Sequence, residues 1–459
     1  VIQVTSGFCQ ATGRESSDRS VCMSASRPRS IPRRSPSPEP PHRGETMADT
    51  LTDAAPDTDG RVPEYPMPRA TGCPLAPSPA AAELRGDRPI TRVRIWNGST
   101  PWLITRHADQ RTLLTDPRVS NDDHEPDFPH VNAHRAAIAP HTPKLITNTD
   151  APEHTRLRRS VNAPFLVKRI EAMRPAVQKI VDDLIDDMLA GPSPADLLTA
   201  LALPVPSLVI AELLGVPYED HHFFQENSNR VLDNSLTAEE AQESSRALGG
   251  YLDTLFRTKL EQPGEDVLSE MGSKVKAGEM THQEAVSMGV AMLIAGHETT
   301  ATMISLGTLA LFEHPDQLAV LRDTEDPKVV AGAVDELLRY LSIVHSGLRR
   351  VAKGDIEIDG RLIRKGDGLL FDLQTANWDP NAFPGAERLD LARPARQHNA
   401  FGYGPHQCLG QNLARLELQV VYGTLYRRVL TLRPAVPVDQ LAFNHTGTTY
   451  GVKCLPVTW

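Results

Sequence analysis

Cys408 stands in a glycine-rich segment whose residue types suit a metal-binding thiolate. The segment reads Phe401-Gly402-Tyr403-Gly404-Pro405-His406-Gln407-Cys408-Leu409-Gly410. Its three glycines lack a Cβ atom, so the backbone can turn sharply and approach a flat ligand closely. Leu409, Leu413, Leu416 and Val420 then recur at helical spacing and predict an apolar helix face. A helix N-terminus favours a thiolate, and a thiolate can be the single axial protein ligand of haem iron.

A second group of residues combines an acid, a hydroxyl and two small side chains. Ala295-Gly296-His297-Glu298-Thr299-Thr300 lies within an apolar segment of about thirty residues that has helical spacing. Small residues at 295 and 296 would let a flat macrocycle and O2 lie against the backbone. Glu298 and Thr299 supply the carboxylate and hydroxyl that proton delivery to bound oxygen needs. The alternative is that Thr299 bonds to the preceding helical turn and Glu298 faces solvent.

Two further charged patterns support these groups. Glu336 and Arg339 are three residues apart on a predicted helix and can form a salt bridge. His154 and Arg158 are four apart on another predicted helix, for which we expect Asp150 as the N-cap. Two donors on one helix face can bind a carboxylate, although solvated surface cations are the simpler alternative.

Together these motifs resemble the cytochrome P-450 family, in its own order along the chain. The matching patterns are Phe-x-x-Gly-x-x-x-Cys-x-Gly, Ala-Gly-x-Asp/Glu-Thr-Thr, Glu-x-x-Arg and His-x-x-x-Arg, and the resemblance runs from about Tyr65 to Trp459. It implies a mainly α fold with small β-sheets. It also implies a haem b (iron protoporphyrin IX) between the long central helix and the cysteine loop with its following helix.

The resemblance assigns a role to particular residues. Cys408 would be the metal ligand, with Glu298 and Thr299 as the catalytic pair. The other haem contacts would be His154, Arg158, Ala295, Gly296, Arg350, Phe401, His406 and Gly410. Structural support would come from Glu336, Arg339 and Arg388. The substrate pocket would include Met292, Ala295, Val344, His345 and Thr446.

The activity implied is that of a bacterial haem-thiolate monooxygenase of the actinobacterial type. Such an enzyme inserts one oxygen atom from O2 into a small or medium lipophilic metabolite, by hydroxylation or epoxidation, in secondary metabolism. The chain has no flavin or iron–sulfur motif, so we expect a ferredoxin and a ferredoxin reductase as electron donors. Their docking face would lie over Cys408, with positive charge from Arg396, His398 and Arg415.

Two alternatives remain open from the sequence. The segments 65–70 and 202–207 also resemble soluble nitric oxide reductases of the same family, which take electrons directly from a nicotinamide cofactor. Those enzymes lack the acid found here at Glu298, which weighs against this alternative. A non-enzymatic haem-thiolate sensor or carrier is the other, and it has no obvious use for the Glu298–Thr299 pair.

Composition restricts the partners. The 459-residue chain has a formal net charge of −10, which argues against a nucleic-acid partner. The longest apolar run, 285–296, is too short to span a bilayer, so we expect no membrane partner. The five cysteines are few and widely spaced, which fits a reducing cytoplasm. We expect a monomer.

The organisation along the chain follows from local composition. Residues 1–46 are rich in Ser, Pro and Arg and predict a disordered leader or upstream extension; 47–459 would form the catalytic domain. Segments around 92–96 and 102–105 predict a hairpin, and most of the chain from there to about 340 reads as helical. The other expected features are a long loop at 118–147, strands at 355–360 and 368–371, and an irregular segment at 376–407.

Overall fold

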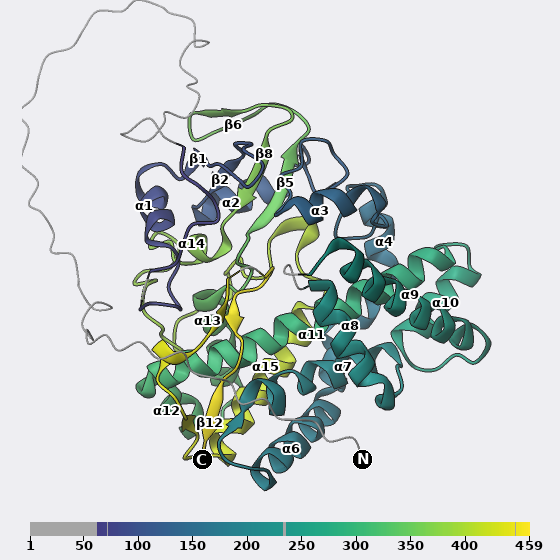
Figure 1. The fold of residues 1–459 in the computed structure, drawn as a ribbon, viewed down its shortest axis with the longest axis vertical. Coiled ribbons are helices and arrows are strands. Elements are labelled where there is room, and N and C mark those ends of the chain that lie inside the picture. The colour runs from purple at the N-terminus through teal and green to yellow at the C-terminus, as the bar shows by residue number, and fades with distance from the viewer. Residues whose placement is uncertain (1–61, 71, 233–235, 446) are drawn as a thin grey trace, which may run out of the picture.

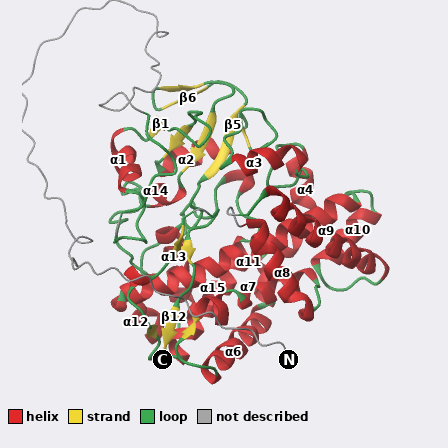
Figure 2. Ribbon diagram, in the orientation of Figure 1, coloured by secondary structure: helices red, strands yellow, loops and turns green. Residues whose placement is uncertain are grey.

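Helices form most of the molecule, with small sheets at its margins. The computed structural model describes residues 62–70, 72–232, 236–445 and 447–459. A β-rich layer lies at one end and the helices gather at the other, as Figure 1 shows by position along the chain and Figure 2 by type of element. The prediction of a mainly α fold with small sheets is confirmed. The expectation for residues 1–46 falls outside the described residues.

The helices and short helical turns have the following bounds. The α-helices are α1 Pro79–Asp87, α2 His107–Thr115, α3 Ala133–Ile138, α4 Glu153–Val161, α5 Val167–Ala172, α6 Arg174–Ala190, α7 Pro204–Leu214, α8 His221–Leu232, α9 Ala238–Glu261, α10 Val267–Lys276, α11 His282–Glu313, α12 Pro315–Asp323, α13 Pro327–Leu341, α14 Leu373–Asn377 and α15 Gln411–Arg428. The short turns are η1 Ala139–His141, η2 Ala163–Phe165, η3 Leu198–Ala202, η4 Tyr218–Asp220, η5 Gly404–His406 and η6 Val438–Gln440.

The largest sheet joins distant parts of the chain in the order β1-β2-β8-β5-β3. β2 pairs with β8 in parallel, and the other neighbours pair antiparallel. Smaller sheets have the orders β4-β12-β9, β10-β11 and β6-β7. The strand bounds are β1 Ile90–Arg92, β2 Trp102–Ile104, β3 Val119–Ser120, β4 Ala195–Asp196, β5 Leu348–Ala352, β6 Ile356–Ile358, β7 Arg361–Ile363, β8 Gly368–Phe371, β9 Arg433–Pro434, β10 Phe443–Asn444, β11 Gly451–Val452 and β12 Pro456–Thr458.

Both ends of the long central helix α11 are well defined. At its start, Thr281 accepts a bond from the Glu284 amide at 3.2 Å, while Glu284 accepts one from the Thr281 amide at 2.7 Å. This reciprocal pair satisfies two donors that the first turn would otherwise leave unpaired. At its end, Pro315 begins the next helix, α12. Between them, α11 packs within the largest hydrophobic core, and it runs across the middle of the molecule in Figure 1.

Most element positions agree with the sequence-based expectations. The predicted hairpin is β1–β2, displaced towards the N-terminus by two residues in its first strand. The loop at 118–147 contains β3 and the short helix α3, so it is less irregular than expected. The expected Asp150 N-cap is wrong: α4 begins at Glu153, and the Asp150 side chain accepts bonds from Ser120 Oγ at 2.5 Å and the Asn121 amide at 2.8 Å.

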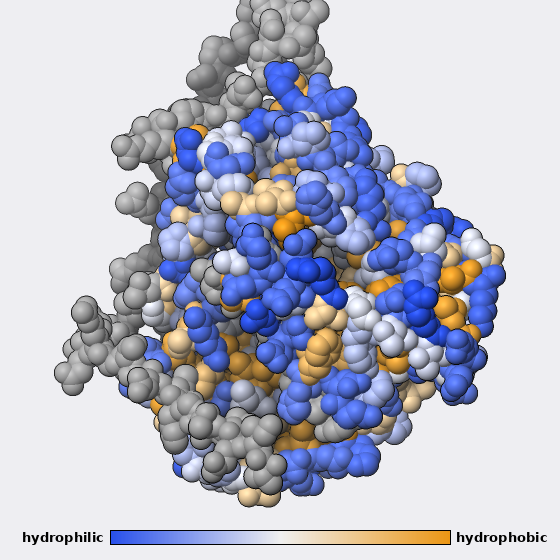
Figure 3. Space-filling model, turned by 45° about the vertical axis from the view of Figure 1, so that its right-hand side comes forward, coloured by the Kyte–Doolittle hydropathy of each residue, from blue (hydrophilic) through white to orange (hydrophobic). Residues whose placement is uncertain are grey.

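The molecular surface is consistent with this packing. The face drawn in Figure 3 is mostly hydrophilic, with hydrophobic residues in separate small groups. Among the described residues, every helix is too short or too polar to cross a lipid bilayer.

Candidate active site

The cysteine loop has a backbone that glycine makes possible. Gly402 and Gly404 adopt φ values of +71° and +75°, in the left-handed region that other residues rarely enter. A Cβ on Gly404 would lie 2.6 Å from the carbonyl oxygen of Leu114. The Cys408 amide donates to the Phe401 carbonyl at 2.9 Å and closes the loop. The chain then enters α15 at Gln411, so the sulfur lies just before that helix, as the sequence predicts.

Cys408 combines an exposed residue with a thiol in protein surroundings. Burial by the surrounding protein raises the pKa of the thiol. The Gly410 N–H and the Arg158 and Arg415 guanidinium groups oppose this rise. Because burial outweighs these groups, the thiol favours its neutral form unless a cation binds the sulfur. The site is therefore suited to a thiolate that a metal stabilises.

The central helix also has a face that adjoins open space. Ala295 is exposed, although Met292 and His297 on either side of it are buried. Thr299 is partly exposed, and its Oγ1 donates to the Ala295 carbonyl at 2.9 Å. The threonine therefore bonds to the preceding turn, as one of the alternatives expected. Glu298 does not simply face solvent, because its Oε1 accepts a hydrogen bond from Thr449 Oγ1 at 2.9 Å.

Four cationic or donor side chains gather between α4, β5 and the cysteine loop. The ring centroids of His154 and His406 lie 4.0 Å apart. Arg350 is buried beside them in the cluster. Burial, then the Arg350 charge, lowers the pKa of His406 to about 4, and burial lowers the pKa of Arg350 to about 10. Burial also lowers the pKa of Arg158, against the attraction of Cys408. The charges of Arg158 and Arg350 therefore lie in a poorly solvated place, where His154 and His406 are neutral donors near pH 7.

The cluster and the thiol fit a haem. The Nε2 atom of His154 is buried without a hydrogen-bond partner, which is costly unless a ligand supplies an acceptor. Two propionate carboxylates would supply such acceptors and offset the positive charge. The described part of the chain contains no group of three or more His, Cys, Asp or Glu residues that could hold a metal ion. A metal at Cys408 must therefore bring most of its ligands with it, as a porphyrin does.

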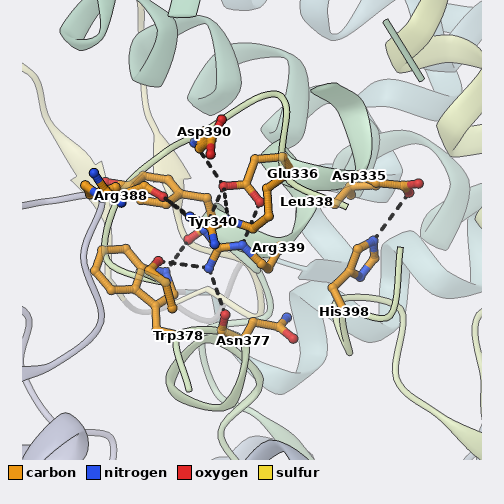
Figure 4. Close-up of polar contacts among 12 residues, drawn as sticks. Asp335, Glu336, Leu338, Arg339, Tyr340, Asn377, Trp378, Arg388, Asp390 and His398 are labelled. Atoms are coloured by element: carbon orange, nitrogen blue, oxygen red, sulfur yellow. Dashed lines mark hydrogen bonds and ion pairs between the residues drawn. The ribbon is translucent and has the colours of Figure 1, made fainter. Parts of the chain in front are cut away.

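The pair on α13 is buried and tied to the irregular segment before the cysteine loop. Glu336 accepts from Arg339 Nε at 2.7 Å and from Nη2 at 2.8 Å, and both side chains are fully buried. Arg339 Nη1 also donates to the carbonyls of Asn377 and Ala386, at 2.8 and 2.9 Å. Figure 4 shows this guanidinium pointing into the segment that follows α14. The network fixes the course of the chain towards Cys408.

The third side chain of this network is Arg393, so the prediction of Arg388 is wrong. Arg393 Nε lies 3.1 Å from Glu336 Oε1. Arg388 is exposed and contributes its backbone carbonyl, which accepts from Arg339 Nη2 at 3.3 Å. Both arginines lie in the same irregular segment, and local sequence does not distinguish a buried guanidinium from an exposed one. Only the fold of 378–400 around α13 selects between them.

Two of the expected pocket residues, Val344 and His345, lie beside the C-terminal hairpin of β10 and β11. Val344 forms an antiparallel bridge with Thr449, and the His345 amide donates to the Thr448 carbonyl at 3.2 Å. Met292 is buried on α11. Thr446 lies outside the described residues. The sequence reasoning missed Thr449, which no local pattern connects to Glu298, 151 residues away.

The expected positive docking face is only partly present. His398 is buried, and Arg415 Nε lies 2.8 Å from Asp335 Oδ1. Arg396 is exposed. The expectation for His398 is therefore wrong, and the charge of Arg415 is already compensated.

Comparisons with known proteins agree on one family. The Cytochrome P450 family model matches residues 254–432. Cytochrome P450 GfsF of Streptomyces halstedii is 52% identical over 90% of this chain and 100% of its own length, and its crystal structure matches with a TM-score of 0.82. Cytochrome P450 CYP105Q4 of Mycobacterium marinum is 51% identical over 90% of this chain and 100% of its own. The mycinamicin VIII C21 methyl hydroxylase MycCI of Micromonospora griseorubida, bound to mycinamicin VIII, is 42% identical, covers 87% of this chain and 100% of its own, and has a TM-score of 0.79.

Proposed function

The chain belongs to the cytochrome P450 family of haem-thiolate monooxygenases, and we propose that it oxidises a small or medium lipophilic metabolite of bacterial secondary metabolism. The reaction is the insertion of one oxygen atom from O2, by hydroxylation or epoxidation. The observation that carries the proposal is the exposed Cys408, whose thiol interacts electrostatically with Arg158 of the partly buried group His154, Arg158, Arg350 and His406. The relative solved with mycinamicin VIII supports a lipophilic substrate class.

Cys408 would hold the haem iron, and the cationic cluster would hold its propionates. His154, Arg158, Arg350 and His406 offer donors at a place where burial makes uncompensated positive charge unfavourable. When bound in this way, haem b supplies the iron at which O2 is activated. Phe401 carries the carbonyl that orients the Cys408 amide, and Gly410 donates its N–H towards the sulfur. Ala295 is the exposed small residue on the central helix and leaves room there for the cofactor and O2. The prediction of Gly296 as a second such residue is not supported, because a Cβ on Gly296 would lie 3.0 Å from the Ile210 side chain on α7.

Glu298 and Thr299, on the central helix α11, would deliver protons to the site. A carboxylate that exchanges protons with solvent can pass them to the hydroxyl of the neighbouring threonine. In the structure the Thr299 proton is directed to the Ala295 carbonyl at 2.9 Å. Delivery therefore requires this hydroxyl to turn towards the cavity.

Electrons come from a redox partner, as is general in this family. We propose a ferredoxin with its ferredoxin reductase. The docking face would lie over the cysteine loop, where Arg396 is exposed. A location in the cytoplasm agrees with such partners.

The reduced, CO-bound absorption spectrum tests the thiolate. The purified protein should give the red-shifted Soret band of a haem-thiolate, and Cys408→Ala should lose it. Cys454→Ala is the matched control, because Cys454 lies 46 residues after Cys408 and outside the cysteine loop. An unchanged spectrum in Cys408→Ala would refute the ligand.

A metabolite panel tests the reaction. Substrates should shift the spin state of the ferric protein, and reconstitution with ferredoxin, reductase and NADPH should convert them into products carrying one added oxygen. Rapid oxidation of NADH by nitric oxide without any partner would instead favour a nitric oxide reductase. Binding without turnover by any donor system would contradict the proposed reaction.

A further inference from the structure

The C-terminal hairpin makes a direct hydrogen bond to the acid of the central helix. Thr449 precedes β11, and its Oγ1 donates to Glu298 Oε1 at 2.9 Å. Thr449 is buried, with 5% of its surface exposed. An ionised carboxylate only accepts hydrogen bonds, so in this contact the threonine must be the donor. The bond joins two residues that lie far apart in the chain.

The hairpin is fixed firmly against both α11 and the segment that follows α13. Val344 bridges Thr449, and the Tyr450 amide donates to the Ile343 carbonyl at 2.8 Å. Gly451 packs so closely on α11 that a Cβ there would lie 2.7 Å from Thr302 Cγ2. The position of Thr449 is therefore determined by backbone contacts on two sides. A hydroxyl held this rigidly can define where the Glu298 carboxylate points.

We propose that Thr449 is a positioning residue for proton delivery, and that it anchors the acid Glu298 to the segment 343–345. The bond from Thr449 holds the Glu298 carboxylate in one orientation, from which it supplies protons to Thr299. Without the bond the carboxylate leaves this orientation and delivery becomes less efficient. This inference rests on the proposed monooxygenase function and specifies how its acid is controlled.

The main test is the fraction of electrons from NADPH that appear in product. In Thr449→Val the shape is nearly kept and the donor is lost, so this fraction should fall by roughly threefold to tenfold with more hydrogen peroxide formed. Substrate affinity from the spin-state shift should change by less than about twofold, because the bond concerns the acid. Thr449→Ser should restore this fraction, which is called the coupling below. If the valine variant fails to take up haem, Thr449→Ala replaces it, since alanine cannot clash.

A matched control and a double variant make the test specific. Thr448→Val removes a hydroxyl from the adjacent residue and should leave coupling unchanged. In a Glu298→Ala background, Thr449→Val should cause no further loss of coupling. The two changes should also be non-additive in the melting temperature of the haem-loaded protein, a readout independent of turnover.

The outcomes separate this inference from the function on which it rests. Wild-type coupling in Thr449→Val, or a loss that persists in the Glu298→Ala background, would overturn the role of Thr449 and leave the monooxygenase proposal intact. Wild-type coupling in Glu298→Ala would overturn both the acid and its positioning residue. Absence of oxygenated product from the unmodified protein is the distinct result that would overturn the proposed function itself.

Discussion

Replacing Arg393 with alanine should destabilise the protein far more than replacing Arg388. Arg393 donates to Glu336 at 3.1 Å, to the Gly385 carbonyl at 2.9 Å and to the Pro384 carbonyl. Glu336 is fully buried, so it cannot exchange this partner for water. Arg388 acts through its backbone carbonyl, which an alanine retains.

The magnitude follows from what remains after each change. Removing one partner of a buried ion pair costs about 3–5 kcal/mol when it leaves a charge uncompensated. In Arg393→Ala, Glu336 keeps Arg339 at 2.7 and 2.8 Å and stays compensated, so we expect only the loss of charge-assisted hydrogen bonds, about 3 kcal/mol at most. In Arg388→Ala the lost side chain is exposed, so we expect less than about 0.5 kcal/mol. For a chain of this size the first change corresponds to roughly 5 °C in melting temperature.

Thermal unfolding of the haem-loaded variants, followed by the Soret band at one scan rate, is the appropriate assay. The scan rate must be fixed because loss of a cofactor makes unfolding irreversible. The fraction of protein that retains the thiolate-type CO spectrum after mild heating gives a second readout, since this network supports the cysteine loop. A larger effect of Arg388→Ala than of Arg393→Ala would refute the assignment.

Three other outcomes follow from the structure. Gly404→Ala should lower haem content and melting temperature by more than Gly360→Ala. Both glycines have a positive φ, which costs alanine about 1–2 kcal/mol, but only a Cβ at position 404 would meet a backbone oxygen, at 2.6 Å. Equal effects of the two substitutions would contradict this. Arg158→Gln should weaken haem binding by roughly tenfold in a haem titration, whereas the exposed Arg159→Gln should not; equal affinities would argue against the propionate role. Burial lowers the pKa of His345 to about 4. The free energy of unfolding therefore has its full contribution from this residue above pH 6.5, where the histidine is neutral in both the folded and the unfolded chain. That contribution, up to about 3 kcal/mol, is lost as the pH falls towards 4. His345→Gln should therefore show a flatter acid limb in melting temperature between pH 7 and 4.5, and an unchanged limb would exclude this residue as its cause.

Local sequence was sufficient where the chemistry is local. The glycines around Cys408 and the helix after it follow from backbone freedom and apolar spacing within about twenty residues. The central helix follows from apolar residues at helical spacing over about thirty residues. Glu336 and Arg339 are one helical turn apart, so their contact also needed no knowledge of the fold.

The errors all concern partners that are distant in sequence. Asp150 reads as a helix cap, but its carboxylate is used by Ser120 and Asn121, about thirty residues earlier. Arg393 reaches α13 only because the irregular segment folds back over it. His398 reads as a surface cation and is buried beside Asp335. In each case an equally plausible local alternative existed, and tertiary packing decided between them.

The parallel pairing of β2 with β8 has a consequence for the synthesis of this protein. Trp102 is paired with Leu369, which leaves the ribosome about 270 residues later. At typical elongation rates this interval is on the order of 10 to 50 s. Throughout it, the early hairpin has an unprotected apolar edge of the kind that recruits other chains. Newly made protein should therefore depend on chaperones most strongly before Phe371 is translated, and truncations upstream of that point should be prone to aggregate.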